Sequence, residues 1–219
     1  MIKNFKEKIM RILLLPLAWL ISSFGYGQKF FSEGTITYAV QTTVDGKSIA
    51  DGVFSVQQIK GSFTRVELKS PLGKNITLFN ARDEEGAMLQ EFGSQKIMIP
   101  ITRENLEERN AKYQNIVFTT GTSSKKILDY TCSNASTVLA DGTVIEVFYA
   151  KELVTDNVGI GFQFGKLPGL ALEFTSISGN RAVKYSATSI SFEPVPVQNF
   201  DLPTSGYRVM SFEESKKKK

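Results

Sequence analysis

The chain has 219 residues, among them 26 Lys or Arg, 22 Asp or Glu, one cysteine and no histidine. The lack of histidine excludes Ser-His-Asp and Cys-His nucleophile systems in their usual form, and with a single cysteine it also excludes the common zinc sites. One cysteine cannot form an internal disulfide, so we expect no disulfide framework, no metal and no cofactor.

The N-terminal segment has the pattern of a secretory signal peptide. Four basic residues within the first eleven precede the apolar stretch 12–21, and small residues follow it. This stretch is too short to cross a bilayer comfortably, which takes about 20 apolar residues. We therefore expect residues 1–27 to be removed before Gln28 and the protein to be exported to the periplasm or cell envelope. We expect no lipid anchor, because no cysteine follows the apolar stretch.

Most of the excess positive charge lies at the two ends of the chain. Residues 28–215 carry 18 basic and 21 acidic residues, and residues 216–219 are four lysines. A nucleic-acid-binding protein would show a basic patch on its folded face, so we expect no nucleic-acid partner. We predict a single β-rich domain over 28–215. The lysine run is predicted to be a disordered tail, with at most peripheral membrane contact.

Alternation of apolar and polar residues predicts strands along most of the chain. In 35–41, for example, Ile36, Tyr38 and Val40 share one face. The further predicted strands are 52–60, 62–69, 75–80, 87–92, 96–99, 116–120, 126–139, 143–150, 170–177 and 181–193. Asp45-Gly46, Asp141-Gly142 and Ser178-Gly179 supply the positive φ angles of hairpin turns. The predicted fold is mainly β, a strongly curved antiparallel sheet, because a sheet of about ten strands must curl or close.

The helical signals are few. Residues 102–115 predict one helix, with Thr102 as its N-cap and Glu104 in its first turn. Its apolar residues are chiefly Leu106 and Tyr113, so it should lie on the surface or across an opening. A second helical turn is predicted near 150–157.

Two carboxylates stand within predicted strands, Glu146 and Glu173. An acid–base pair for hydrolysis is one hypothesis. The favoured one is that each points to solvent or pairs with a Lys or Arg on a neighbouring strand. The acidic run 83–85 lacks the spaced oxygen ligands of a calcium loop and is interpreted as a solvated loop. We therefore expect no catalytic residues and no enzyme activity.

A Pro-Gly corner precedes the strand predicted at 170–177. Pro168 cannot donate to a sheet ladder, and Gly169 can take a positive φ. The pair is predicted to end the preceding loop and start the strand sharply. Leu170, Leu172 and Phe174 should then enter the core, with Glu173 pointing outward. We interpret the corner as a determinant of the fold.

Four stretches carry a resemblance to a known family. They are "GTITYAVQ", "ILDYTCSNASTVLADGTVIEVFYAKEL", "GFQFGKLPGLALEF" and "FDLPTSGYRVMSFEE". Their order resembles secreted proteins of the GLPGLI family, which are common in Bacteroidota and of unknown function. The namesake motif would be represented by Leu167, Pro168, Gly169 and Leu170. Lys166 and Ala171 depart from it at the two ends.

The resemblance implies an architecture similar to the lipoprotein carriers LolA and LolB, a curved half-barrel with helices over its concave side and a cavity for acyl chains. A large sheet with one sparse helix also makes a cavity plausible from the residues alone. Its candidate lining residues are Phe79, Leu89, Phe92, Ile97, Met98, Phe118, Val147 and Phe174. The expected function is non-enzymatic binding or carriage of a lipid or acylated ligand, such as an acylated protein. The alternative is an envelope module that binds a protein partner through a sheet edge or surface patch.

Overall fold

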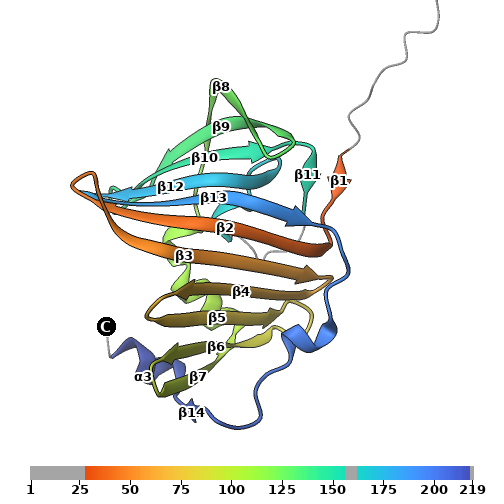
Figure 1. Ribbon diagram of the computed structural model, residues 1–219, viewed down its shortest axis with the longest axis vertical. Helices are drawn as coiled ribbons and strands as arrows, with labels where there is room; N and C mark the ends of the chain where they lie inside the picture. Colours follow the sequence, from red (N-terminus) through yellow and green to blue (C-terminus); the bar gives the residue numbers. More distant parts are fainter. Residues whose placement is uncertain (1–27, 156–161, 218–219) are drawn as a thin grey trace, which may run out of the picture.

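A computed structural model describes residues 28–155 and 162–217 of the chain. Most of them belong to one 12-stranded sheet with the order β14-β7-β6-β5-β4-β3-β2-β13-β12-β10-β9-β8 (Figure 1). The strands are β2 (Glu33–Val44), β3 (Lys47–Lys60), β4 (Phe63–Ser70), β5 (Gly73–Asn80), β6 (Glu85–Phe92), β7 (Gln95–Thr102), β8 (Thr119–Ile127), β9 (Tyr130–Val138), β10 (Val144–Ala150), β12 (Leu170–Ser178), β13 (Arg181–Ser191) and β14 (Arg208–Val209). All neighbours are antiparallel except β14 and β7. The prediction of a mainly β, strongly curved antiparallel sheet is confirmed.

The sheet consists of two meanders joined at one seam. Strands β2 to β7 follow one another as hairpins, and β8, β9, β10, β12 and β13 form a second run. The seam is the pairing of β2 with β13, in which Ile36 is the partner of Ile190. In Figure 1 the two strands lie side by side in the middle of the sheet. The first and last long strands of the chain therefore hold the two halves together.

The predicted turns produce hairpins, although not by one mechanism. At Asp45-Gly46 both residues have positive φ, 52° and 75°, as a type I′ turn requires. At Asp141-Gly142 and Ser178-Gly179 only the glycine is in this region. The strand predicted at 126–139 is interrupted, because Leu128 has a φ of 52° and separates β8 from β9. The strand predicted at 116–120 begins only at residue 119, as the start of β8.

The helix predicted at 102–115 is shorter and divided. Helix α2 (Arg103–Arg109) has the predicted cap, because the Thr102 hydroxyl accepts a hydrogen bond from the Asn105 amide. It ends at Asn110, whose side-chain amide donates to the Leu106 carbonyl at 2.8 Å and satisfies an acceptor of the last turn. A 3₁₀ turn, η1 (Ala111–Tyr113), follows.

The second helical expectation was wrong. The turn predicted near 150–157 is instead strand β11 (Leu153–Val154), which pairs in parallel with β1 (Lys29–Phe30); the end of the predicted range lies outside the described residues. Lys216, the first residue of the predicted lysine tail 216–219, ends helix α3 (Phe212–Lys216), and residues 218–219 lie outside the described residues. Its ammonium lies 2.9 Å from Glu108 of α2. The capping box of Ser211 and Glu214 starts this helix, a signal that the sequence contains.

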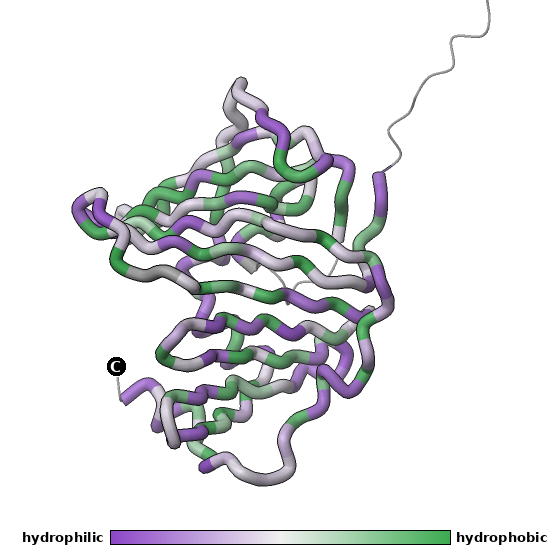
Figure 2. Tube along the Cα trace, viewed as in Figure 1, coloured by the Kyte–Doolittle hydropathy of each residue, from purple (hydrophilic) through white to green (hydrophobic). Residues whose placement is uncertain are grey.

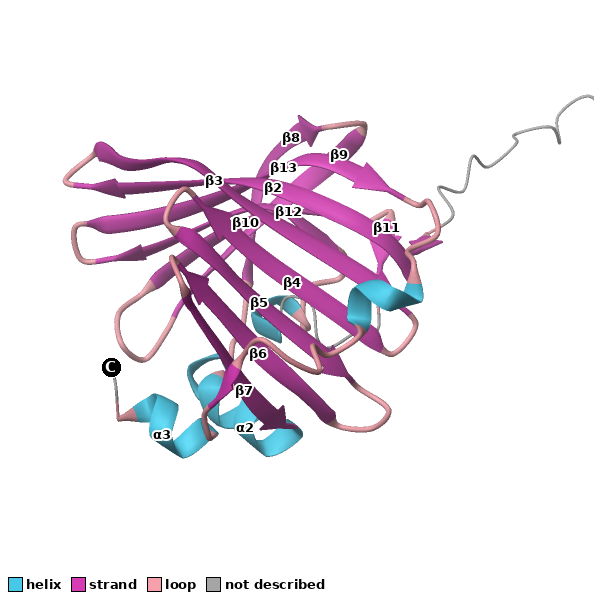
Figure 3. Ribbon diagram, turned by 60° about the horizontal axis from the view of Figure 1, so that its bottom comes forward, coloured by secondary structure: helices cyan, strands magenta, loops and turns pink. Residues whose placement is uncertain are grey.

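The two faces of the sheet are covered differently at β5 to β7. On one face Phe79, Ile99 and Ile101 pack with Met210 and Phe212, beside which α2 and α3 lie (Figure 3). Hydrophobic and hydrophilic residues are interspersed along the strands in Figure 2, and on β7 the consecutive residues Ile97, Met98 and Ile99 place apolar side chains on both faces. The opposite, outer face carries a smaller apolar cluster of Ile76, Leu78, Ala87 and Leu89, with Met98 and Tyr207 packed against it. The largest core lies around β2, β10 and β12.

Candidate ligand-binding cavity

A cavity of about 1250 Å³ lies between one face of the sheet and the segments that cross it. We call this face the inner face and this space the inner cavity. The crossing segments are α2, η1 and the loop 163–169, which includes part of η2 (Phe162–Phe164). The inner-face residues that line the cavity are Tyr38, Ser55, Gln57, Val66, Leu68, Asn75, Thr77, Phe174, Ser176, Val183 and Tyr185. Ligand sites commonly measure about 300–1000 Å³, so the space is sufficient for a large ligand.

Aromatic side chains form the wall of the inner cavity at β2, β12 and β13. The Phe174 and Tyr185 rings are stacked, with centroids 4.5 Å apart, and Phe164 meets Phe174 edge-on at 4.7 Å. The ring of Tyr38 lies 5.9 Å from that of Phe174. The Tyr38 hydroxyl donates to the Ala171 carbonyl at 2.8 Å, which satisfies it, and burial raises its pKa well above the ordinary value. These neutral rings offer a rigid apolar surface.

Polar side chains replace the aromatic ones toward β3 and β5. Gln57 is 8% exposed and Ser55 is 2% exposed, and both line the inner cavity. Asn75 and Thr77 of β5 continue this polar stretch. Between them on β4 lie Val66 and Leu68, which are the register partners of Thr77 and Asn75. The inner cavity is therefore amphipathic, with an aromatic end and a polar end.

The Pro-Gly corner forms part of the cavity wall. Leu167, Pro168, Gly169 and Leu170 all line the inner cavity, and β12 starts at Leu170. Gly169 does not have a positive φ, so that expectation was wrong. A glycine is required for a different reason: a Cβ atom at 169 would lie 2.3 Å from the Ala150 carbonyl oxygen. The corner brings the backbone against the end of β10, where no side chain fits.

Of the eight candidate lining residues, Phe174 lies in the wall of the inner cavity. Phe79 and Ile97 are on the same face but belong to the cluster beside α3, and Leu89 and Met98 are on the outer face. Phe92 is 43% exposed at a hairpin end. Val147 is buried in the main core, and Phe118 packs against that core with its ring 6.2 Å from Phe164.

The sequence contained signals for several cavity residues that were not singled out. Tyr38 follows the alternation of 35–41, and Tyr185 stands in the strand predicted at 181–193. Their position in the cavity depends on the seam between β2 and β13, which no local pattern reveals. Arg109 and the polar residues of β3 and β5 carry no sequence motif at all.

The two strand carboxylates have separate environments, and neither lines the inner cavity. Glu173 is paired as expected, with the ammonium groups of Lys125 at 2.5 Å and Lys184 at 3.2 Å. Burial acts to raise its pKa, but the hydrogen bonds from Lys125 and Lys184 outweigh this and lower the pKa below its ordinary value. Glu146 is exposed to solvent on β10. The favoured hypothesis is confirmed, since Glu146 points to solvent and Glu173 pairs with lysines.

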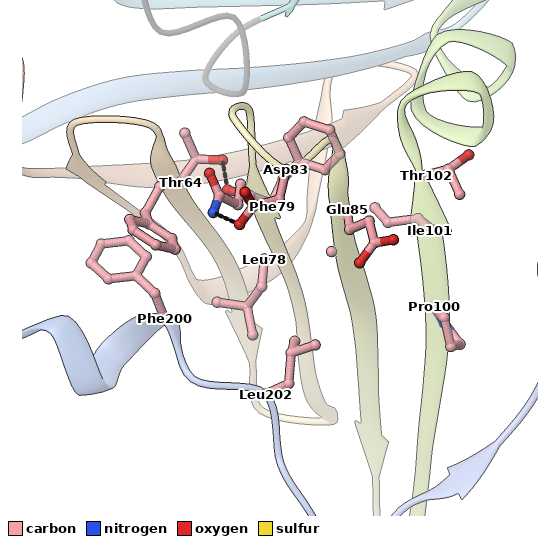
Figure 4. A pocket seen from close by; sticks show the side chains of 13 residues that line it. Thr64, Leu78, Phe79, Asp83, Glu85, Pro100, Ile101, Thr102, Phe200 and Leu202 are labelled. Carbon is pink, nitrogen blue, oxygen red and sulfur yellow. Dashed lines mark hydrogen bonds between the residues drawn. The ribbon is translucent and has the colours of Figure 1, made fainter.

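A second, smaller hollow of about 460 Å³ lies at the hairpin end of β5 and β6 (Figure 4). Phe200 and Leu202 of the C-terminal segment, which includes η3 (Val197–Phe200), face Leu78 across it. Asp83 and Glu85 line its rim, and Asp83 accepts a hydrogen bond from the Asn80 side chain at 2.5 Å. Residues 83–85 are exposed, as expected of a solvated loop.

No group of three or more Cys, Asp or Glu side chains in 28–155 and 162–217 could hold a metal ion. None of the helices found in these ranges is both long and apolar enough to span a membrane.

Comparison with known proteins gives only distant similarities. No protein-family model matches the sequence, and no curated protein gives a significant match. Among solved structures, the chain is similar to PNGF-II, with a TM-score of 0.47 and 16% identity over 81% of this chain; it spans only 31% of PNGF-II. It is also similar to the Pseudomonas aeruginosa MucA/MucB complex, with a TM-score of 0.39 and 9% identity over 78% of this chain and 56% of the other. The Mycobacterium tuberculosis lipoprotein LppX gives a TM-score of 0.34 and 11% identity over 75% and 90% of the two chains. None of these TM-scores reaches 0.5, so we infer nothing about this chain from what those proteins bind.

Proposed function

We propose that the protein is a non-enzymatic protein of the cell envelope that binds a lipid or an acylated ligand in the inner cavity. The single observation that carries this proposal is the cavity of about 1250 Å³ with an aromatic wall. An apolar cavity with a few polar groups is the usual form of a small-molecule site. The signal-like segment 1–27, which lies outside the described residues, supports export.

The chemistry of the lining favours binding over catalysis. Glu107 is the only carboxylate among the described lining residues, and an acid–base pair for hydrolysis needs two suitable groups. The rings of Phe164, Phe174 and Tyr185 contact one another and carry no formal charge. Such a surface holds hydrocarbon without forming a bond to it.

The free energy gained by burying an acyl chain depends on the length and number of its chains. Each buried CH₂ group contributes about 0.8 kcal/mol, so ten of them contribute roughly 8 kcal/mol. Loss of translational and rotational freedom offsets about 4 kcal/mol or more of this gain. The remaining free energy, about 4 kcal/mol or less, corresponds to a Kd of about 1 mM or weaker. We therefore expect weak binding of a single ten-carbon chain, and tighter binding of longer chains or of ligands with two chains.

The test is saturable binding of the uncharged fluorescent probe N-phenyl-1-naphthylamine to the mature protein. Leu68→Asp places a carboxylate in the cavity wall, where an unpaired charge is costly, and should weaken binding about tenfold or more. Leu72→Asp is the matched control, because Leu72 is 82% exposed in a turn; its affinity should equal that of the wild type. Absence of saturable binding to the wild type, or equal affinity of both variants, would refute the proposal.

The alternative, a protein partner bound along a sheet edge, has less structural support. Strand β8 ends the sheet order and is almost entirely exposed. Its pairing with β9 is irregular between Thr120 and Ser124, and it carries Lys125 and Lys126. Irregular pairing and lysine side chains on an edge strand hinder the pairing of another chain with that edge. An intact wild-type cavity that binds no probe, together with a stable envelope protein partner in a pull-down, would favour this alternative.

A further inference from the structure

The two ends of the inner cavity differ in charge as well as polarity. At its aromatic end the rings of Tyr38, Phe174 and Tyr185 line the wall, and these rings carry no charge. At its polar end lies Arg109, the last residue of α2. The sheet order places β4 and β3 between β5 and β2. Three strand spacings, about 14 Å, therefore separate β5 from Tyr38 of β2, so only an elongated ligand can reach both ends.

Arg109 lies over β6 and β5. Its guanidinium donates a hydrogen bond to the Met88 sulfur on β6. Met88 is the register partner of Thr77 on β5. Asn75 precedes Thr77 by two residues and therefore lies on the same face of the strand. Arg109 therefore lines the same space as the Thr77 hydroxyl and the Asn75 amide, and Thr77 lies opposite the residue that Arg109 contacts. A carboxylate or phosphate at this point would meet one cationic and two neutral hydrogen-bonding groups.

No carboxylate among the described residues forms an ion pair with Arg109. Glu107 also lines the inner cavity, but residues two apart on a helix do not face each other. Arg109 is exposed to solvent and also lines the inner cavity, so its guanidinium is available to a ligand there. A thioether is a weak acceptor for a guanidinium, which prefers bidentate contact with an anion.

We infer that Arg109, with Thr77 and Asn75 beside it, binds the anionic head group of an elongated amphiphile whose hydrocarbon tail lies against Tyr38, Phe174 and Tyr185. The head group is a carboxylate or a phosphate, because both accept the planar pair of guanidinium hydrogens. This inference rests on the proposed function and specifies the class of its ligand. Lys166, in the loop 163–169, is the other described cation in the cavity lining and provides the internal comparison.

The experiment measures displacement of N-phenyl-1-naphthylamine at pH 8 by four compounds with the same twelve-carbon chain: dodecanoate, dodecyl phosphate, dodecanol and dodecyltrimethylammonium. We expect one or both anions to bind the wild type at least about tenfold more tightly than dodecanol, as for a hydrogen bond to a charged group. The tighter anion identifies the source as a fatty acid or a phosphorylated lipid. The cationic compound should bind most weakly.

Variants then assign the preference to Arg109. Arg109→Gln should retain probe binding and lose the preference for anions, Arg109→Lys should keep part of it, and Lys166→Gln should keep all of it. Equal displacement by dodecanoate, dodecyl phosphate and dodecanol in the wild type would refute the inference. So would a preference that survives in Arg109→Gln, or one that disappears in Lys166→Gln instead. In each of these cases probe binding still supports the cavity, whereas a wild type that binds no probe refutes the proposed function itself.

Discussion

Replacement of Gly169 by alanine is expected to destabilise the fold by steric overlap. A Cβ atom at this position would lie 2.3 Å from the carbonyl oxygen of Ala150 and 2.7 Å from its carbonyl carbon. Both are backbone atoms of a residue that is fully buried at the end of β10. No rotamer change can relieve the contact, so either β12 or β10 must move.

The size of the effect follows from this overlap. The Cβ–oxygen distance of 2.3 Å falls short, by about 1.1 Å, of the 3.4 Å at which ordinary van der Waals contact begins. Overpacking of a buried site typically costs about 1–3 kcal/mol through shifts of backbone and side chains. We expect Gly169→Ala to lower the free energy of unfolding by an amount in the upper part of that range, and Gly169→Val to lower it further.

Denaturation in urea measures this loss, provided that the slope with denaturant is unchanged. Gly142 is the control, because its φ is 80° and no atom lies within 4 Å of the place that a Cβ atom would occupy there. Asparagine tolerates positive φ, so Gly142→Asn should be close to the wild type, whereas Gly169→Asn should be as damaging as Gly169→Ala. A midpoint for Gly169→Ala within error of the wild type would show that the contact with β10 is not required.

Two other predictions concern titratable groups. Because the pKa of Glu173 is lowered in the folded state, its contribution to stability should be present above about pH 4.5 and be lost as the pH falls through the lowered value. Glu173→Gln should therefore reduce the free energy of unfolding by about 1–2 kcal/mol at pH 7, and the stability of this variant should depend less on pH in the acid range. Glu146→Gln, at an exposed position, is the control and should change the stability little. Identical dependence of stability on pH in the wild type and Glu173→Gln would contradict this prediction. Burial raises the pKa of the Cys132 thiol to about 11, and the residue is 0% exposed. Iodoacetamide at pH 8 should therefore label Cys132 only in denaturant. Rapid labelling of the native protein would show that β9 opens.

Local patterns in the sequence were sufficient to predict the strands but not their neighbours. The alternation in 35–41 and the Asp45-Gly46 turn are short-range signals, and each produced the expected element. The pairing of β2 with β13 is set by how two meanders bury their apolar faces together, so no short segment encodes it. The assignment of residues 1–27 as a signal peptide and of 28–215 as one domain stays a prediction.

The cavity itself could be anticipated only in outline. A large curved sheet with little helix indicated a hollow face, and the segment around α2 does cross it. Which residues line the hollow depends on which face of each strand is turned toward it. A shift by one residue moves a side chain to the other face. Leu89 and Met98 were predicted to line the cavity but lie on the outer face. Membership in the GLPGLI family likewise stays a prediction.

The seam between β2 and β13 has a consequence for how the chain folds. Strands β2 to β7 can form from neighbours in the chain, but β2 must wait for β13, whose residues come late in the sequence. Contacts between distant segments form slowly, because loop-closure entropy must be lost before they contribute. During that interval β2 presents an open edge that can pair with another molecule. If the chain is exported from its N-terminus onward, as the signal-like segment predicts, the arrival of residues 181–191 would set the period during which aggregation competes with folding.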